Sequence, residues 1–191
     1  WTQPERVIES FNKLWSFENV SLETIFKEVD EFSSSLLVLS NRIRLVLVPA
    51  WVLPSYYRGY GMLDMKANFG ITDILLRMNI RLSENIGKAP NIYLLNANKW
   101  TSFVGKNALN PKLWYMGKIA FNNEVFKEAA SDIKAALNGV IGNSKKLIIV
   151  DLDDTLWGGI VGDDGWKNLK LGGHDHIGEA YADFQKALKT L

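Results

Sequence analysis

Cysteine is absent from the 191 residues of the chain. A disulfide framework, a thiolate metal site and a cysteine nucleophile are therefore excluded, and the composition suits a reducing compartment such as the cytoplasm. Histidine is nearly as scarce, because His174 and His176 are the only two in the sequence. Two histidines leave little material for a histidine-based metal site. We expect a cytoplasmic protein.

An excess of charge of either sign is also missing. Lysine and arginine together number 22, and aspartate and glutamate number 21, which gives a net charge of +1. Proteins that bind nucleic acid usually carry a strongly basic field. We therefore expect no nucleic-acid partner.

A long hydrophobic run is missing too. The most apolar stretch, residues 36–53, is interrupted by Arg42, Arg44 and Pro49, whereas a membrane-spanning helix needs about 20 apolar residues in succession. The first residues lack the basic and then apolar pattern of a secretory signal peptide. We expect no membrane partner.

Helical and strand patterns alternate along the chain. Apolar residues recur with the spacing of an amphipathic helix at residues 7–15, 22–36, 71–82, 125–140 and 177–191. Compact apolar runs predict buried strands at residues 43–48, 91–95 and 147–150. Such alternation is typical of an α/β fold with a mainly parallel sheet. A short polar joint at residues 142–146 marks a boundary, so we expect domains at 1–142 and 143–191.

Two aspartates follow the expected strand at 147–150 directly, in the sequence Asp151-Leu-Asp-Asp-Thr155. Ligands of open α/β sheets bind just beyond the carboxyl ends of the strands. In extended backbone, a two-residue spacing places Asp151 and Asp153 on the same side. Two such carboxylates repel each other unless a cation or a proton intervenes, and Mg2+ prefers oxygen ligands of this kind. One carboxylate could attack phosphorus while the other donates a proton to the leaving oxygen.

The same residues also have a purely structural interpretation, in which the aspartates only cap a loop. A calcium-binding EF-hand loop is excluded, because Leu156 stands where that loop needs glycine and Gly162 stands where it needs an acid.

Several motifs carry a resemblance to a known family. Leu147-Ile-Ile-Val-Asp-Leu-Asp-Asp-Thr155 resembles the first motif of the haloacid dehalogenase (HAD) superfamily, an apolar strand that ends in Asp-x-Asp-x-Thr. The FkbH-like proteins of that superfamily are similar in further segments, namely Leu156-Trp-Gly-Gly-Ile-Val-Gly-Asp-Asp-Gly165, Gly178-Glu-Ala180, Phe184-Gln185 and Leu113-Trp-Tyr-Met-Gly-Lys-Ile119. The resemblance covers about the last eighty residues closely and the earlier part loosely.

This resemblance implies a Mg2+-dependent HAD enzyme that loads a glyceryl unit from bisphosphoglycerate onto the thiol of an acyl carrier protein. Its substrate would be a small phosphorylated acyl compound. On this pattern Asp151 is the nucleophile and Asp153 the general acid/base, and both hold Mg2+, Asp153 through its backbone carbonyl. Asp154 occupies the variable position of the motif and receives no catalytic role. Backbone amides after Asp151 would hold the phosphate, which assigns phosphate binding to Leu152, Asp153 and Thr155.

A flap is expected over the same pocket. Its candidate residues, which would also face the substrate, are Trp157, Gly158, Gly159 and His174. His174 lies in the sequence His-Asp-His, whose residue types can ligate metals, but adjacent positions seldom point at one ion. A place in the flap is therefore the better interpretation for His174.

The part before residue 142 resembles the SGNH-hydrolase-like domain found upstream in this family. That implies a three-layer sandwich with a mainly parallel, flavodoxin-like sheet, followed by the start of a Rossmann-like HAD domain. An active esterase of this type needs a Gly-Asp-Ser block and an Asp-x-x-His block. Neither block occurs, and no histidine precedes His174. We expect an accessory domain that lacks hydrolytic residues.

Three functions stay open. The first is the phosphatase and acyl transferase that acts with an acyl carrier protein, and the second is a plain HAD phosphatase acting on a small phosphate ester. The third is a non-catalytic carrier-docking or scaffold module. HAD chemistry also needs a later serine or threonine, a later lysine and further acids, yet only 40 residues follow Asp151 in the chain of 191. We expect residues 143–191 to be an incomplete catalytic domain and the chain alone to be inactive.

Overall fold

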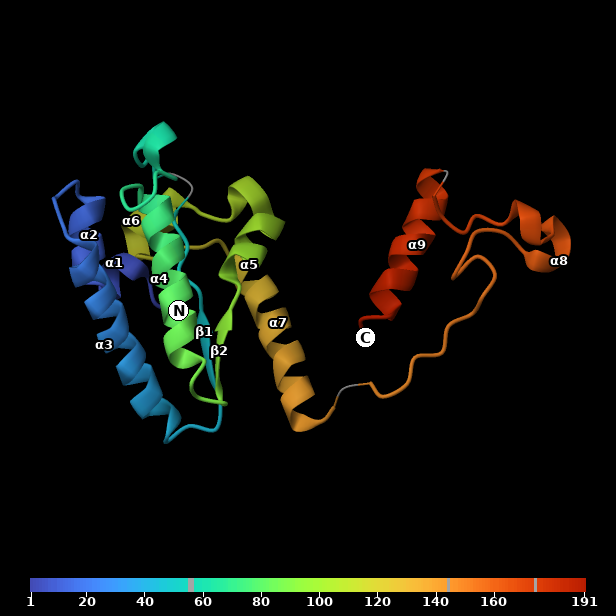
Figure 1. The fold of residues 1–191 in the computed structure, drawn as a ribbon, viewed down its shortest axis with the longest axis horizontal. Coiled ribbons are helices and arrows are strands. Elements are labelled where there is room, and N and C mark those ends of the chain that lie inside the picture. Colours follow the sequence, from blue (N-terminus) through green and yellow to red (C-terminus); the bar gives the residue numbers. More distant parts are fainter. Residues whose placement is uncertain (55–56, 144, 174) are drawn as a thin grey trace. The chain divides into compact units, whose positions relative to one another are not determined.

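Two short strands run parallel to each other in the first part of the chain (Figure 1). Strand β1, Val46–Pro49, pairs with strand β2, Ile92–Leu95, and the register places Val46 beside Ile92. Both strands form within or next to the apolar runs that were expected to be strands. Parallel strands require a crossover connection, and helix α4, Ile71–Ile86, lies in that connection.

The computed structural model describes residues 1–54, 57–143, 145–173 and 175–191. The chain divides into an N-terminal unit, Trp1–Leu137, and a C-terminal unit, Asn138–Leu191. This division lies a few residues before the boundary that the polar joint predicts.

Helices make up most of the N-terminal unit. Besides α4 they are α1 Pro4–Val7, α2 Glu9–Trp15, α3 Leu22–Ser40, α5 Ala97–Val104, α6 Pro111–Gly117 and α7 Asn123–Ile141, with 3-10 helices at Gly61–Leu63 and Gly105–Asn107. The described residues thus form a mixed α/β structure that is rich in helix and has a small parallel sheet. The α/β class and the amphipathic helices expected in this part are confirmed. Among the described helices, none has both the length and the apolar composition that a membrane span requires.

Helices α3 and α4 pack against each other (Figure 1). Ser21 begins α3 as its N-cap, because its hydroxyl oxygen accepts a hydrogen bond from the Thr24 N–H at 3.1 Å. Between the helices, Arg81 donates to both carboxylate oxygens of Asp30, at 2.7 and 2.6 Å. These bonds hold the pKa of Asp30 below its usual value. The apolar faces beneath them form one core, which includes Ile25, Val29, Ile74, Met78 and Leu82.

The chain is also clamped directly after β1. The Trp51 side chain is fully buried, and its backbone is held by Asn79 of α4. The Trp51 N–H donates to Asn79 Oδ1 at 2.9 Å, and Asn79 Nδ2 donates to the Trp51 carbonyl at 2.9 Å. One side chain thereby satisfies two backbone groups that have no strand partner at this point.

The C-terminal unit contains little regular structure. Besides the last residues of α7, its elements are α8 Val161–Asp164, a 3-10 helix at Trp166–Asn168 and α9 His176–Leu188. The prediction of a strand at residues 147–150 is wrong, because the structure has no strand there. Leu147 and Ile149 are 75% and 87% exposed. A strand needs a neighbour for its backbone hydrogen bonds, and no strand in the described residues pairs with this segment.

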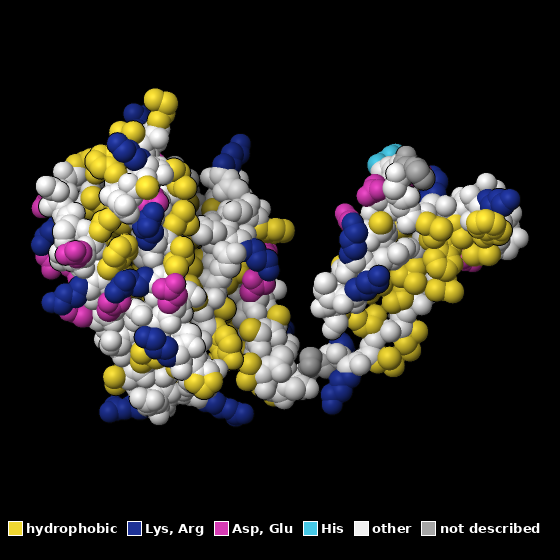
Figure 2. Space-filling model, in the orientation of Figure 1, with side chains coloured by type: hydrophobic (Ala, Val, Ile, Leu, Met, Phe, Trp, Pro, Cys, Tyr) yellow, Lys and Arg dark blue, Asp and Glu magenta, His cyan; other side chains and the backbone are white. Residues whose placement is uncertain are grey.

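Hydrophobic side chains in the C-terminal unit are largely exposed. Every buried hydrophobic residue of the described chain precedes residue 130. Figure 2 shows a band of hydrophobic side chains on the face of this unit that it displays. Exposed members of the unit include Leu152, Ile160, Val161, Trp166 and Leu171. Hydrogen bonds must therefore provide most of the local order in this unit.

The Asn79 clamp leads to a prediction for the N-terminal unit. Asn79→Ala leaves two largely buried backbone groups of Trp51 without partners, so we expect a loss of about 2 kcal/mol in the free energy of unfolding. Urea unfolding measures this loss. The matched control is Asn98→Ala, which changes an exposed side chain in α5 and should alter stability little; equal stability of both variants would contradict the clamp.

Candidate functional site

The aspartate motif forms a tight turn. The Leu152 carbonyl accepts hydrogen bonds from the Thr155 N–H at 3.3 Å and the Leu156 N–H at 2.8 Å. Asp154 has a φ of 51°, in the left-handed region that non-glycine residues seldom adopt. The structure therefore has a turn where extended backbone was expected to align Asp151 and Asp153. Strand geometry does not place these two side chains on the same side.

The first two aspartates differ in how their oxygens are used. Asp151 is exposed, and its Oδ1 accepts only the N–H of the neighbouring Leu152, at 2.8 Å, among the described residues. Asp153 is half-buried, and its Oδ1 accepts the Trp157 indole N–H at 3.0 Å and the Val161 N–H at 3.4 Å. Asp153 thus links the turn to Trp157 and Val161 later in the loop. Among the described residues, Asp151 is bonded only to the residue beside it.

Two further carboxylates complete this closure. Asp154 Oδ1 accepts the Gly159 N–H at 2.7 Å, and Asp164 Oδ2 accepts the Ile160 N–H at 2.9 Å. The residue pattern assigns Asp154 no catalytic role and does not by itself indicate this structural one. The signal that could have revealed it is the tolerance of aspartate for left-handed backbone and for short-range bonds to the main chain.

Gly158 is required by close packing. It is buried, and it exchanges two backbone hydrogen bonds with Lys170, at 3.1 and 2.8 Å. A Cβ atom at Gly158 would lie 2.8 Å from Cε2 of Tyr181 in α9. Gly159 has a φ of 105°, which favours glycine. Both residues were expected in a flap, and the structure places them where the loop meets α9.

An open hollow of about 570 Å3 lies beside the turn. Asp154, Thr155 and His176 line it together with apolar side chains of α9. Asp175 begins α9 as its N-cap and accepts the N–H groups of Gly178 and Ile177, which lower the pKa of Asp175. His174, expected in the flap, lies outside the described residues.

Two of the three expected phosphate-binding N–H groups, those of Leu152 and Thr155, are engaged inside the turn. The Leu152 N–H donates to the Asp151 carboxylate, and the Thr155 N–H donates to the Leu152 carbonyl. The Leu152 side chain is 52% exposed. A phosphate oxygen could reach the Leu152 N–H only by replacing the Asp151 oxygen on it.

The described residues hold no group of three or more histidine, aspartate or glutamate side chains placed to bind a metal ion. Two carboxylate oxygens are nevertheless free, since Oδ2 of Asp151 and Oδ2 of Asp153 accept no hydrogen bond from the described part of the chain. Mg2+ is often held by one or two carboxylates together with water and substrate phosphate. The donor chemistry of the pair therefore fits Mg2+ as part of a site.

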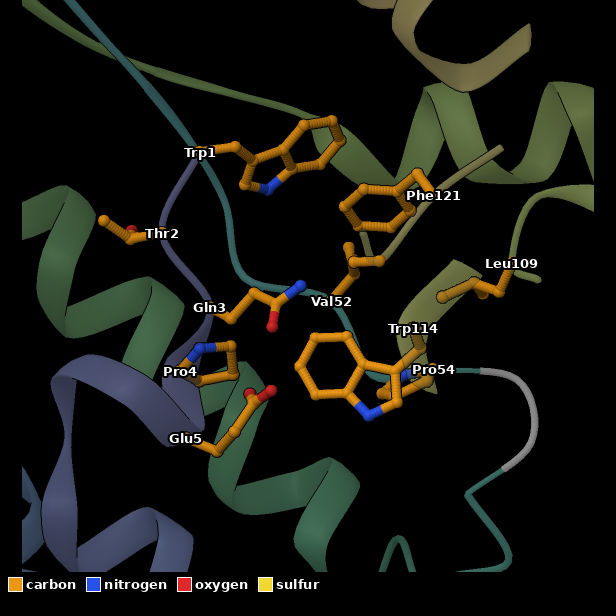
Figure 3. Close-up of a pocket in the computed structure, with 11 residues that line it drawn as sticks. Trp1, Thr2, Gln3, Pro4, Glu5, Val52, Pro54, Leu109, Trp114 and Phe121 are labelled. Carbon is orange, nitrogen blue, oxygen red and sulfur yellow. The ribbon is translucent and has the colours of Figure 1, made fainter. Parts of the chain in front are cut away.

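A small cavity in the N-terminal unit lies next to the chain that follows β1 (Figure 3). Its volume is about 20 Å3, which is room for one water molecule. Oε1 of Gln3 is buried there without a hydrogen-bond partner among the described residues. Burial raises the pKa of Glu5, which also lines the cavity. A cavity of this size is too small to be a substrate pocket.

No family model matches the chain, and no curated protein matches it. Among solved structures, the chain is similar to the N-terminal part of the protein BF1531 from Bacteroides fragilis, which contains a phosphatase domain and is complexed with Mg. The TM-score is 0.76 and the identity is 24%, over 96% of this chain and 48% of that one. The chain thus spans about half the length of the solved structure, and a likeness at this identity shows a shared fold.

Packing around Gly158 provides a prediction for the loop. Gly158→Ala forces the added methyl group against the Tyr181 ring, so we expect the Lys170 amide, bonded to the Gly158 carbonyl, to exchange its hydrogen at least about tenfold faster. Amide hydrogen exchange measured by NMR tests this. Gly162→Ala is the matched control, since a Cβ at Gly162 meets no atom within 4 Å. Unchanged exchange in Gly158→Ala would refute the packing argument.

Proposed function

We propose that this chain provides the first part of a HAD-type, Mg2+-dependent phosphatase in which Asp151 is the nucleophile. The observation that carries the proposal is the distribution of hydrogen bonds over the three aspartates. Asp153 and Asp154 accept N–H groups that close the loop, whereas Asp151 is exposed and, within the part of the chain that the structure describes, accepts only from its neighbour. The resemblance of residues 147–155 to the first HAD motif and the shared fold with a Mg-bound phosphatase domain support it further.

In this proposal Asp151 Oδ2 attacks the phosphorus atom of the substrate. Asp153 donates a proton to the leaving oxygen from Oδ2, since its Oδ1 is already engaged by two N–H groups. The backbone N–H groups of Leu152, Asp153 and Thr155 would then turn to the phosphate oxygens. When bound, Mg2+ neutralises charge on the phosphate, and Asp151 and Asp153 are the residues that would hold it.

The narrower proposal is an FkbH-like enzyme that transfers an acyl unit. The thiol of an acyl carrier protein attacks the acyl carbon of a small acyl phosphate, so that the carrier thioester forms and inorganic phosphate leaves. This transfer takes place at carbon and is separate from the attack of Asp151 on phosphorus, which removes a phosphoryl group and leaves the free acid or alcohol. The thiol must belong to the carrier, because this chain has no cysteine. What supports this step is the FkbH-like sequence between Leu156 and Gly165. A cytoplasmic location is part of the same proposal.

For the N-terminal unit we propose an SGNH-like accessory role. The parallel pairing of β1 with β2 and the flanking helices fit part of a three-layer sandwich. The missing Gly-Asp-Ser and Asp-x-x-His blocks argue against hydrolysis by this unit. A docking or scaffold role for the whole chain is the second candidate, favoured by the exposed hydrophobic residues of the C-terminal unit.

Asp151→Asn in the natural protein that carries these residues tests the nucleophile. We expect Mg2+-dependent phosphate release from an acyl phosphate to fall by about three orders of magnitude or more, because the attacking oxygen is replaced by an amide. Release of inorganic phosphate measures the rate. Asp163→Asn, at an exposed position of α8, is the control that should keep full activity. Full activity of Asp151→Asn would rule out the assignment.

The same assay separates transfer from plain hydrolysis. With bisphosphoglycerate and acyl carrier protein present, a gain in carrier mass supports the acyl transferase. Release of free product without any gain in carrier mass supports the plain phosphatase. Complete inactivity of the natural protein on all phosphorylated substrates would leave the docking module as the surviving candidate.

A further inference from the structure

We propose that Trp157 is a positioning residue that fixes the orientation of the Asp153 carboxylate. It commits Oδ1 to the loop and leaves Oδ2 as the oxygen that a ligand can reach. This inference rests on the proposed function, in which Asp153 is the general acid/base. It also gives Trp157 a role different from contact with the substrate.

The contact itself is directional. Trp157 Nε1 donates to Asp153 Oδ1 at 3.0 Å. An indole has one N–H donor and no acceptor, so this bond uses the entire hydrogen-bonding capacity of the side chain. The Val161 N–H reaches the same oxygen, at 3.4 Å. Both donors converge on Oδ1, and none of the described residues donates to Oδ2.

The backbone on either side of Trp157 is anchored. Before it, the Leu156 carbonyl accepts a hydrogen bond from Gln185 Nε2 of α9. After it, Gly158 exchanges two backbone hydrogen bonds with Lys170. Because the backbone is held on both sides of Trp157, its side chain can impose an orientation on its partner. Trp157 therefore sets the orientation of the Asp153 carboxylate, and Trp157 itself is placed by α9 and by the segment around Lys170.

The indole ring has apolar surroundings on the same unit. Trp157 is half-buried and lies with Leu156, Leu171 and Leu188 along one hollow. Phenylalanine at position 157 would keep most of this packing and lose only the N–H donor. The substitution Trp157→Phe therefore separates the hydrogen bond from the packing of the ring.

Indole hydrogen exchange tests the contact in the 191-residue chain without metal. We expect the Trp157 indole N–H to exchange with water at least about tenfold more slowly than that of Trp166, which is 71% exposed. Asp153→Ala should abolish this difference. A Trp157 indole that exchanges as fast as Trp166 in the unsubstituted chain, or that stays equally protected in Asp153→Ala, overturns the proposal.

Turnover by the natural protein tests the consequence. A general acid must hold its proton within reach of the leaving oxygen, so we expect Trp157→Phe to slow phosphate release at least about tenfold and to shift its pH profile. Trp166→Phe should release phosphate as the unsubstituted protein does. Trp157→His keeps a ring N–H donor and should restore part of the loss.

The outcomes distinguish this inference from the proposed function. If the unsubstituted protein releases phosphate and Trp157→Phe releases it at the same rate with the same pH profile, the positioning role is refuted while the proposed function stands. If the unsubstituted protein releases no phosphate, the proposed function fails, and indole exchange alone decides whether Trp157 orients Asp153. Lys170 amide exchange, measured in Trp157→Phe, verifies that the loop still folds, and a folded loop is required for either conclusion.

Discussion

Carboxylate side chains hold the loop after residue 150 in place. The described residues of the C-terminal unit bury no large hydrophobic side chain, so the loop depends on hydrogen bonds from N–H donors to Asp153, Asp154 and Asp164. The need for these hydrogen bonds decides which aspartates remain available for chemistry. Two glycines shape the same loop. Gly158 allows α9 to approach, and Gly159 adopts a left-handed φ that other residues avoid.

The N-terminal unit is stabilised in a different way. Its helices bury apolar faces against a two-stranded parallel sheet, and polar side chains act mainly as ties between elements. Arg81 links α4 to Asp30 of α3, and Asn79 links α4 to the chain after β1. The N-terminal unit thus has a hydrophobic core, whereas hydrogen bonds hold the loop of the C-terminal unit. The aspartate motif lies in this loop.

Amphipathic helices could be predicted from the sequence, because the spacing of residues such as Ile74, Met78 and Leu82 directly encodes a buried face. The apolar pattern at residues 147–150 wrongly predicted a strand, since a strand forms only where a neighbouring strand pairs with its backbone groups. The aspartate motif could be located by residue type and order. Its internal contacts could not, because the Asp153–Trp157 bond depends on a turn whose shape comes from Asp154 and Gly159.

We propose Asp151 as the nucleophile because its carboxylate is the least engaged of the three aspartates among the described residues. Mass spectrometry of the natural protein carrying Asp153→Asn, mixed with an acyl phosphate and Mg2+, tests it most directly. In the proposed mechanism Asp153 is the general acid/base, so its loss should slow hydrolysis and let the phosphorylated enzyme accumulate. We predict one phosphoryl group, located on Asp151. A phosphoryl group on any other residue, or none while the unsubstituted protein turns over the same substrate, would contradict the account.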